Sequence, residues 1–218
     1  MKKRLIIALA FLVLFSTYKS KKLIINSKLN IEEIKIENNF ILKSENIKKK
    51  LNFLYNENLI FLDLINLEEK LKKINFIESF EIKKVYPKKL KIKIYEKKPI
   101  VILQYKKKKF YISDNIEIIS FIDLEYYKDL PVVFGDQENF KILYMNLKKI
   151  DFPLDLISKY YFYKSKRWDL ETNKKVIIKL PPKDYIISLK NFMNLRNEIS
   201  FDKYKIFDYR IKDQLILK

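Results

Sequence analysis

The carboxylates are the only side chains of this chain that could carry out catalytic chemistry. Its 218 residues include no histidine, no cysteine and a single glycine. Zinc sites built on Cys or His, Ser-His triads and thiol nucleophiles are therefore excluded. A glycine-rich loop that cradles a phosphate is excluded as well. A carboxylate pair would need a dry cleft, yet the acidic residues are scattered along expected surface faces. The sequence predicts no enzyme, no catalytic residue, no metal and no cofactor.

The formal net charge of +19 could favour binding to an anionic partner such as nucleic acid or a membrane. The excess is spread along the chain: residues 1–99 carry 23 basic and 11 acidic side chains, and residues 100–218 carry 23 and 16. Specific nucleic-acid binding usually needs a basic patch or arm, so solvated lysines are the favoured interpretation. Attraction to an anionic membrane surface stays open.

The N-terminal residues predict a membrane anchor. A basic start, Met1 to Arg4, precedes an unbroken apolar run from Leu5 to Phe15. The run is short for a span of ~30 Å, but lysines up to Lys22 can snorkel outward. No small-residue cleavage site follows, which favours an uncleaved anchor over a signal peptide, with the N-terminus in the cytoplasm. The expected anchor residues are Leu5, Ile6, Ile7, Leu9, Phe11, Leu12, Leu14 and Phe15.

Periodicity predicts a first compact unit up to about Pro99. An imperfect alternation over 30–37 predicts a strand that ends at Asn38-Asn39. Helical spacing predicts two helices, the first N-capped at Ser44 and the second starting at Asn66. Two strands follow, joined by a turn at Pro87, and the second alternates apolar and basic residues over 89–94. The expected order is strand, helix, helix, strand, strand.

Residues beyond Pro99 predict a second domain that is rich in β-structure. Short apolar runs predict strands over 100–105, 110–113, 116–122 and 130–135, and successive antiparallel strands over 157–164, 168–171 and 175–180. The same patterns predict helices over 140–150 and 184–196 and closing strands over 203–208 and 214–217.

Four motifs in this order resemble those of the FtsQ/DivIB family of bacterial cell-division proteins. The first is the strand-turn-strand pattern, and the second is a Leu-Pro-x-x-x-Gly step. The third is Arg-Trp-Asp-Leu, and the fourth is Asp-Tyr-Arg where the family commonly has Asp, an aliphatic residue and Arg. These motifs comprise Tyr86, Pro87, Leu90, Ile92, Ile94, Glu96, Lys97 and Pro99; Leu130, Pro131 and Gly135; 167–170; and 208–210.

The resemblance implies an α+β protein with an N-terminal membrane helix, a POTRA domain (β-α-α-β-β) and an antiparallel β-domain with flanking helices. It places a short cytoplasmic tail and anchor at 1–22, the POTRA domain at 28–98 and the β-domain at 99–218. It implies a non-enzymatic divisome scaffold of the inner membrane. The protein would be single-pass, with its N-terminus cytoplasmic and its bulk periplasmic, at the division septum. Expected partners are FtsB-like and FtsL-like proteins and other divisome components, with no nucleic acid and no small-molecule substrate.

The resemblance also implies that the final strand offers its edge to an extended segment of the FtsB-like partner. Strand alternation would place Tyr209 and Ile211 on one face and Arg210 and Lys212 on the other, where cations could bind partner carboxylates. The expected partner-binding residues are Lys166, Arg167, Tyr209, Arg210, Ile211, Lys212, Asp213 and Gln214. Two structural interpretations stay open: Asp208 and Arg210 pair internally, and Trp168 fills the core.

Two other functions remain alternatives. A POTRA-bearing module could serve protein export or outer-membrane assembly, but that class usually repeats the POTRA unit and adds a barrel. A basic surface protein could bind nucleic acid, and its binding would then depend strongly on salt. The lysines at 89, 91 and 93 are expected to form a solvated face or to protect a strand edge.

Overall fold

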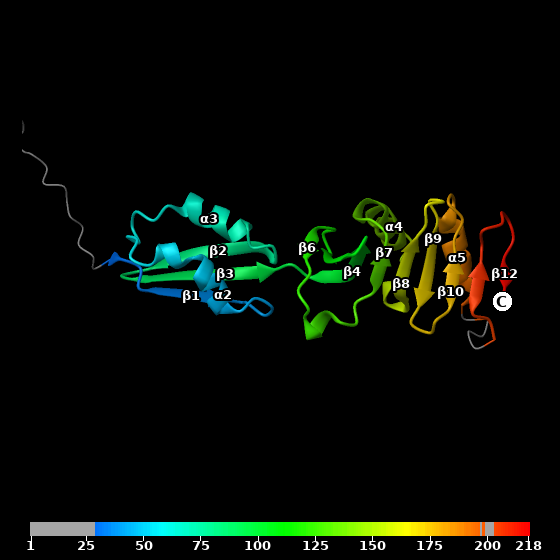
Figure 1. The fold of residues 1–218 in the computed structure, drawn as a ribbon, viewed down its shortest axis with the longest axis horizontal. Coiled ribbons are helices and arrows are strands. Elements are labelled where there is room, and N and C mark those ends of the chain that lie inside the picture. Colours follow the sequence, from blue (N-terminus) through cyan, green and yellow to red (C-terminus); the bar gives the residue numbers. More distant parts are fainter. Residues whose placement is uncertain (1–28, 197, 199–202) are drawn as a thin grey trace, which may run out of the picture. The chain divides into compact units, whose positions relative to one another are not determined.

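The structure is a computed structural model that describes residues 29–196, 198 and 203–218. It contains two compact units, one made of residues up to 73 with 79–95, the other of 74–78 with 96–218 (Figure 1). The expected anchor residues, Leu5 to Phe15, lie outside the described residues. Among the helices that are described, none is long and apolar enough to cross a membrane.

The first unit has the predicted order of strand, helix, helix, strand, strand. Its elements are β1 (Glu33–Glu37), α2 (Ser44–Lys50), the 3-10 helix η2 (Asn52–Leu54), α3 (Leu64–Lys72), β2 (Ile77–Val85) and β3 (Lys89–Glu96). The three strands form a sheet in the order β1-β3-β2, and β1 runs parallel to β3. β1 ends before Asn38, as expected; Asn38 has a positive φ of 62°, and its side chain donates to the carbonyl of Ile94 at 2.8 Å.

The alternation on β3 is confirmed, because Leu90, Ile92 and Ile94 are fully buried. Of the two interpretations of the lysines on its other face, edge protection is wrong, since β3 is the central strand, whereas the partly exposed side chains of Lys89 and Lys91 fit a solvated face. Two of these lysines make cross-strand ion pairs with β1: Lys89 with Glu33 at 2.8 Å and Lys91 with Glu37 at 2.8 Å. Hydrogen bonds from Lys35 and Lys91 lower the pKa of Glu37 to about 2.

The predicted starts of both helices in this unit need correction. Lys43 is the N-cap of α2 and makes no side-chain capping bond, so Ser44 is the first helical residue. α3 starts two residues before Asn66, and the carboxylate of Asp63 accepts the backbone N–H of Asn66 at 3.1 Å. A carboxylate at the N-cap satisfies an amide that the helix leaves free and suits the positive end of its dipole.

The second unit is built on a nine-stranded sheet in the order β12-β11-β10-β9-β8-β7-β4-β5-β6. The strands along the chain are β4 (Pro99–Tyr105), β5 (Lys108–Ser113), β6 (Ile118–Ser120), β7 (Val132–Phe134), β8 (Ile157–Phe162), β9 (Trp168–Thr172), β10 (Ile177–Lys179), β11 (Ile206–Asp208) and β12 (Ile216–Leu217). The helices are α4 (Gln137–Lys149) and α5 (Tyr185–Leu195), with the 3-10 helices η3 (Glu125–Tyr127) and η4 (Leu154–Leu156).

This sheet is mixed, so the expectation of an antiparallel β-domain needs correction. β8, β9 and β10 are successive antiparallel strands as predicted, but β4–β7, β7–β8 and β10–β11 are parallel pairs. Parallel neighbours need a crossover connection. α4 supplies it between β7 and β8, and α5 supplies it between β10 and β11.

One face of the sheet carries the core of the second unit. Phe140, Leu143 and Leu147 of α4 and Leu189 and Phe192 of α5 pack in one buried cluster with strand residues. The strand residues of that cluster include Val133, Tyr160, Trp168, Leu170, Ile178 and Phe207. Trp168 is 4% exposed, which confirms its expected place in the core. Both helices therefore cover the same face.

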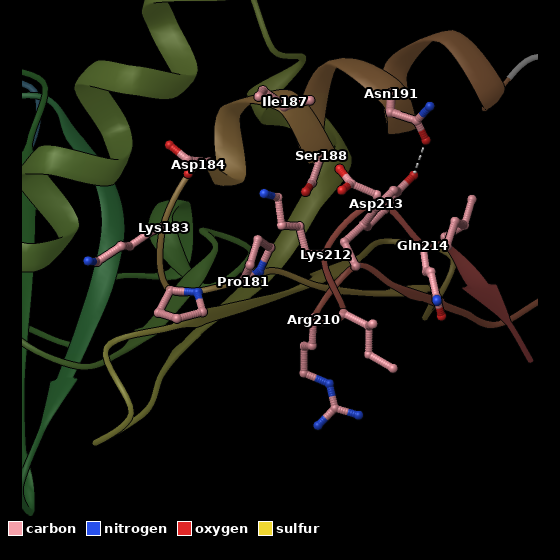
Figure 2. Close-up of a pocket in the computed structure, with 14 residues that line it drawn as sticks. Pro181, Lys183, Asp184, Ile187, Ser188, Asn191, Arg210, Lys212, Asp213 and Gln214 are labelled. Atoms are coloured by element: carbon pink, nitrogen blue, oxygen red, sulfur yellow. Dashed lines mark hydrogen bonds between the residues drawn. The ribbon is translucent and has the colours of Figure 1, made fainter.

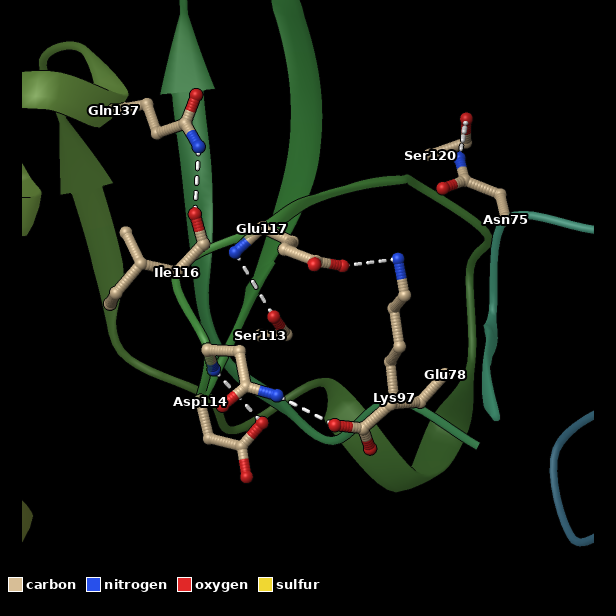
Figure 3. A network of polar contacts seen from close by, with 10 residues as sticks. Asn75, Glu78, Lys97, Ser113, Asp114, Ile116, Glu117, Ser120 and Gln137 are labelled. Carbon is tan, nitrogen blue, oxygen red and sulfur yellow. Dashed lines mark hydrogen bonds and ion pairs between the residues drawn. The ribbon is translucent and has the colours of Figure 1, made fainter. Parts of the chain in front are cut away.

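Residues 74–78 and 96–98 contact the β5–β6 region by polar side chains within this unit (Figure 3). Asn75 donates to the Ser120 hydroxyl at 2.6 Å, and Asn115 donates to Glu78 at 2.6 Å. Lys97 forms an ion pair with Glu117. The β6 end of the sheet is thus contacted by the chain itself.

Candidate functional site: a groove and an open strand edge

A groove of about 550 Å³ lies between α5 and the segment that joins β11 to β12 (Figure 2). Its walls are formed by 181–184, by one side of α5 and by 209–215. It contains six of the eight expected partner-binding residues: Tyr209, Arg210, Ile211, Lys212, Asp213 and Gln214. The other two, Lys166 and Arg167, lie in the connection between β8 and β9.

The expected strand alternation of Tyr209 to Lys212 is wrong, because β11 ends at Asp208 and the chain turns before β12. The Asp208 carboxylate accepts the backbone N–H of Arg210 at 3.1 Å, which bends the chain directly after β11. Asp213 has a positive φ of 57°, and the N–H of Gln214 donates to the carbonyl of Ile211. Tyr209 to Asp213 therefore form a loop rather than two alternating faces.

The guanidinium of Arg210 is held by Asp208. Its Nε donates to Oδ1 at 2.8 Å and its Nη2 to Oδ2 at 2.6 Å, so the pair is bidentate. The bond from Arg210 lowers the pKa of Asp208, and the bond from Asp208 raises the pKa of Arg210. This geometry matches the structural interpretation of the pair. The main role of Arg210 is therefore to hold the loop in place. Contact with a partner would use the part of its side chain that remains exposed.

Tyr209 fastens the same loop to α5. Its hydroxyl donates to the Asn191 side chain at 2.9 Å, and its backbone N–H donates to the carbonyl of Lys179 on β10. The ring is 7% exposed, and burial raises the pKa of Tyr209 to about 12. Tyr209 is therefore a supporting residue of the groove, whereas Ile211 is 52% exposed at its surface.

A second arginine lies on a neighbouring part of the sheet. Arg167 stacks on the ring of Tyr163, with 4.4 Å from its guanidinium carbon to the ring centre, and it pairs with Asp169 at 3.4 Å. Asp169 is 4% exposed, and its burial raises its pKa although Arg167, Lys179 and Arg210 act in the opposite direction. Arg167 and Arg210 thus act on the same carboxylate from two different connections.

The bond between Arg167 and Asp169 is incomplete. Among the buried side-chain atoms that the structure describes, Arg167 Nε and Asp169 Oδ1 have no hydrogen-bond partner. Arg210, in contrast, makes two hydrogen bonds to Asp208, so its guanidinium is held more completely than that of Arg167. Lys166 is exposed in the turn, where its N–H donates to the carbonyl of Tyr163 at 2.9 Å.

The sheet edge beside the groove is open in the described part of the chain. β12 is the terminal strand of the sheet and pairs with β11 alone. Ile206 and Lys218 exchange backbone hydrogen bonds, at 2.9 and 3.1 Å, so the next pair, Phe207 opposite Leu217, is a non-hydrogen-bonded pair. The N–H and C=O of Leu217 therefore point away from β11, where another strand could pair.

Sequence reasoning missed several residues of this site. Leu217 carries the outward main-chain groups, and Pro181, Lys183, Ile187 and Ser188 form the opposite wall of the groove. The Pro181-Pro182 pair is a sequence signal for the end of β10, because proline cannot donate to a ladder. Nothing in the sequence indicates that this loop meets 209–215. Among the described residues there is no group of three acidic side chains that could hold a metal.

Comparisons with known proteins give a consistent result. Residues 29–97 match the family model of the FtsQ-type POTRA domain. The chain is 26% identical over 205 residues to "Cell division protein FtsQ" of Rickettsia typhi, covering 92% of this chain and 73% of that protein. It is 27% identical to the protein of that name in Rickettsia bellii, covering 92% and 72%, and 21% identical to that of Agrobacterium fabrum, covering 86% and 61%.

A solved structure was also matched, the major extracytoplasmic domain of DivIB from Geobacillus stearothermophilus. The alignment covers 49% of this chain and 99% of that one, at 12% identity and a TM-score of 0.33. That score is too low for a comparison of folds. The similarity to the curated relatives, in contrast, extends through both units.

Proposed function

We propose that this chain is a divisome scaffold that recruits an FtsB-like partner through the β12 edge. The chain belongs to the FtsQ/DivIB family of cell-division proteins. The FtsB-like partner would itself be paired with an FtsL-like protein. The chain acts as a single-pass protein of the inner membrane, anchored by Leu5 to Phe15, with its bulk in the periplasm at the septum. It performs no catalysis. The observation that carries the proposal is the open edge of β12, with Leu217 directed outward beside a groove.

An edge of this kind supplies affinity through main-chain hydrogen bonds, and the neighbouring side chains supply specificity. Leu217 would exchange bonds with the partner strand while Ile206 and Lys218 keep the native ladder. The groove next to it, about 550 Å³, would receive the residues that flank that strand. Binding would therefore extend the sheet without changing its existing pairs.

Charge supports an acidic partner segment. Lys183 and Lys212 line the groove together with Asp184 and Asp213, and no ion pair among the described residues includes either lysine. Arg167 already lies 3.4 Å from the buried carboxylate of Asp169, so it is less available to a partner. A carboxylate on the partner could bind these cations, and desolvated charge-assisted bonds are stronger than exposed ones. Arg210 would contribute less, because Asp208 already takes two of its donors.

The alternative role in protein export or outer-membrane assembly is not favoured by the relatives, whose names all refer to cell division. The proposed recruitment goes further than those names, which identify no partner. It needs a direct binding test.

The experiment is co-purification of the full chain, in detergent, with the extracytoplasmic segment of an FtsB-like protein from the same bacterium. Two variants separate the main chain from the side chain. Leu217→Pro removes the outward N–H, and Leu217→Ala keeps it while removing the same side chain. Because that N–H makes no bond to β11, neither change breaks the native ladder.

We expect Leu217→Pro to weaken capture at least about tenfold relative to Leu217→Ala, since strand addition loses a main-chain donor and meets the proline ring. Equal capture by the two variants would rule out pairing at this edge. Ile211→Pro is a poorer test of edge pairing, because Ile211 lies in the turn between β11 and β12 and not in a strand.

A further inference from the structure

An exposed apolar patch in the first unit has no role in the function proposed above. It consists of Ile60, Phe61, Leu64 and Ile65, which are 41%, 70%, 40% and 74% exposed. α3 buries a different face, through Leu67 and Leu71. Four large apolar side chains within six residues form a patch of the kind that marks a protein or membrane contact.

The patch lies at the end of the unit where the chain enters from residues 1–28. The N–H of Leu59 donates to the carbonyl of Leu29 at 2.9 Å, and the N–H of Ile31 donates to the carbonyl of Glu57 at 2.9 Å. The patch begins one residue after Leu59. In Figure 1 the start of the described chain and the connection that leads to α3 lie at the same end of the unit.

Amphipathic side chains border the patch at this end. Lys84 donates from Nζ to the carbonyl of Ile60 at 3.0 Å. Tyr86, in the turn between β2 and β3, is 57% exposed. The carbonyl of Lys88 in the same turn accepts the N–H of Glu32 at 2.9 Å, so the turn lies beside the chain entry. Lysine and tyrosine place apolar stems in lipid and polar tips in water, which suits a membrane interface.

Charged side chains of both signs lie at this end, so local charge does not draw the patch to an anionic surface. Glu57 and Asp63 lie close to the patch in sequence, and Lys88 and Lys89 are paired with Glu32 and Glu33. Residues 29–73 and 79–95 of the first unit nevertheless have 14 lysines and nine acidic residues. Apolar insertion, rather than charge, would therefore supply most of the binding, and anionic headgroups would strengthen it.

We propose that this apolar patch docks on the surface of the lipid bilayer that holds the anchor. The inference rests on the proposed anchor. If the membrane segment ends near Lys22, the six residues 23–28 span at most about 20 Å, whatever their conformation. Leu29 is then tethered close to the headgroups, and the patch next to it lies within reach of them. Phe61 and Ile65, the most exposed members, would enter the interface by ~5–10 Å.

The test uses the absence of cysteine from the sequence. Ile65→Cys gives a unique site for an environment-sensitive fluorophore on the full chain, reconstituted in vesicles of phosphatidylethanolamine and phosphatidylglycerol. Phe40→Cys is the matched control, because Phe40 is 86% exposed in the same unit but follows the far end of β1. Quenching by acyl-chain spin labels is compared with quenching by an aqueous ion.

We expect the label at Ile65 to be quenched by the spin-labelled lipids and shielded from the aqueous ion, and the label at Phe40 to behave in the opposite way. Adding Phe61→Ser to the Ile65→Cys variant should reduce the lipid quenching several-fold. The melting temperature should stay unchanged, because both side chains are exposed. Equal aqueous quenching of both labels would overturn the inference.

Two further outcomes are distinguishable. Shielding at Ile65 without lipid quenching would mean that a protein surface, such as a second copy, covers the patch, and it would overturn the lipid assignment. Failure of the chain to float with the vesicles would overturn the anchor and this inference together. A chain that floats but leaves the Ile65 label in water removes the docking alone and leaves the proposed anchor and recruitment intact.

Discussion

The two edges of the nine-stranded sheet differ in what contacts them. At the β6 edge, side chains of the chain's own segments 74–78 and 96–98 bind the strand and its neighbours (Figure 3). At the β12 edge, Leu217 directs its N–H and C=O away from the sheet, and a groove adjoins the strand (Figure 2). Side chains of the same chain thus crowd the β6 edge, whereas the β12 edge is the one at which we expect a partner strand to be added.

The difference also extends to how the flanking residues are held. The 209–214 loop beside β12 is fixed by the Asp208–Arg210 pair and by the Tyr209–Asn191 bond. The main chain of the open edge is thus available while its surroundings are ordered. Pre-organised binding surfaces lose less conformational entropy on association, which favours strand addition.

Among substitutions of polar side chains near the two sheet edges, Asp208→Asn is expected to have the largest effect on partner capture. It removes the charge that orients Arg210 and weakens the turn that follows β11. We expect capture of the FtsB-like segment to weaken about tenfold, and the free energy of unfolding to fall by about 1 kcal/mol, because Arg210 is partly exposed and its pair is screened. Titration calorimetry and chemical unfolding measure the two quantities.

Asp213→Asn is the matched control, because it neutralises a carboxylate in the same loop and asparagine tolerates the positive φ at this position. It should change capture and stability little. If Asp208→Asn and Asp213→Asn behave alike, the loop is not held by the Asp208–Arg210 pair.

A smaller effect is expected from pH. The pKa of Asp208 is lowered in the folded state, so its stabilising contribution is complete above its unfolded pKa and is lost as pH falls through the lowered value. The pKa of Asp169 is raised by burial, so the folded state gains stability from it as pH falls through the raised value. The two aspartates therefore act in opposite directions during acidification.

Chemical unfolding at a series of pH values from about 6 down to about 3 measures how each aspartate changes the free energy of unfolding. Asp208→Asn should make the loss of stability on acidification shallower than in the parent chain, and Asp169→Asn should make it steeper. A steeper loss in Asp208→Asn would contradict the assigned pairing with Arg210.

The smallest effect is expected at the opposite edge. Asn75→Ala removes an exposed hydrogen bond to Ser120 of β6. The free energy of unfolding should fall by no more than about 1 kcal/mol, and capture of the partner segment should not change. Weaker capture in this variant, measured in the same calorimetric assay, would place the partner at β6 instead of β12.

Local patterns in the sequence predicted the first unit well. The alternation of Leu90, Ile92 and Ile94 and the Asn38 turn depend on neighbouring residues, and both are present as expected. The starts of the two helices were misplaced. Ser44 is a favoured N-cap residue and Lys43 is not, yet Lys43 caps α2, and α3 begins after Asp63 rather than at Asn66. Cap identity depends on where the first turn begins, which the apolar spacing fixes only within a few residues.

The second unit exposed the limits of the same reasoning. Whether neighbouring strands are parallel depends on the crossovers through α4 and α5, and apolar runs do not encode it. The alternation of Tyr209 and Ile211 suggested a strand, but the Asp208 side chain competes for the following backbone N–H and turns the chain. The groove itself requires the 181–184 loop to meet this turn, which is a tertiary contact.

The central claim, that a partner strand adds to β12, is tested most directly by amide hydrogen exchange at two adjacent residues of the full chain. Leu217 N–H points to the open edge, whereas Lys218 N–H is already bonded to Ile206 at 3.1 Å and serves as the internal reference. We predict that saturating FtsB-like segment slows exchange at Leu217 strongly and changes Lys218 far less. Capture of the segment with unchanged exchange at Leu217 would contradict the account.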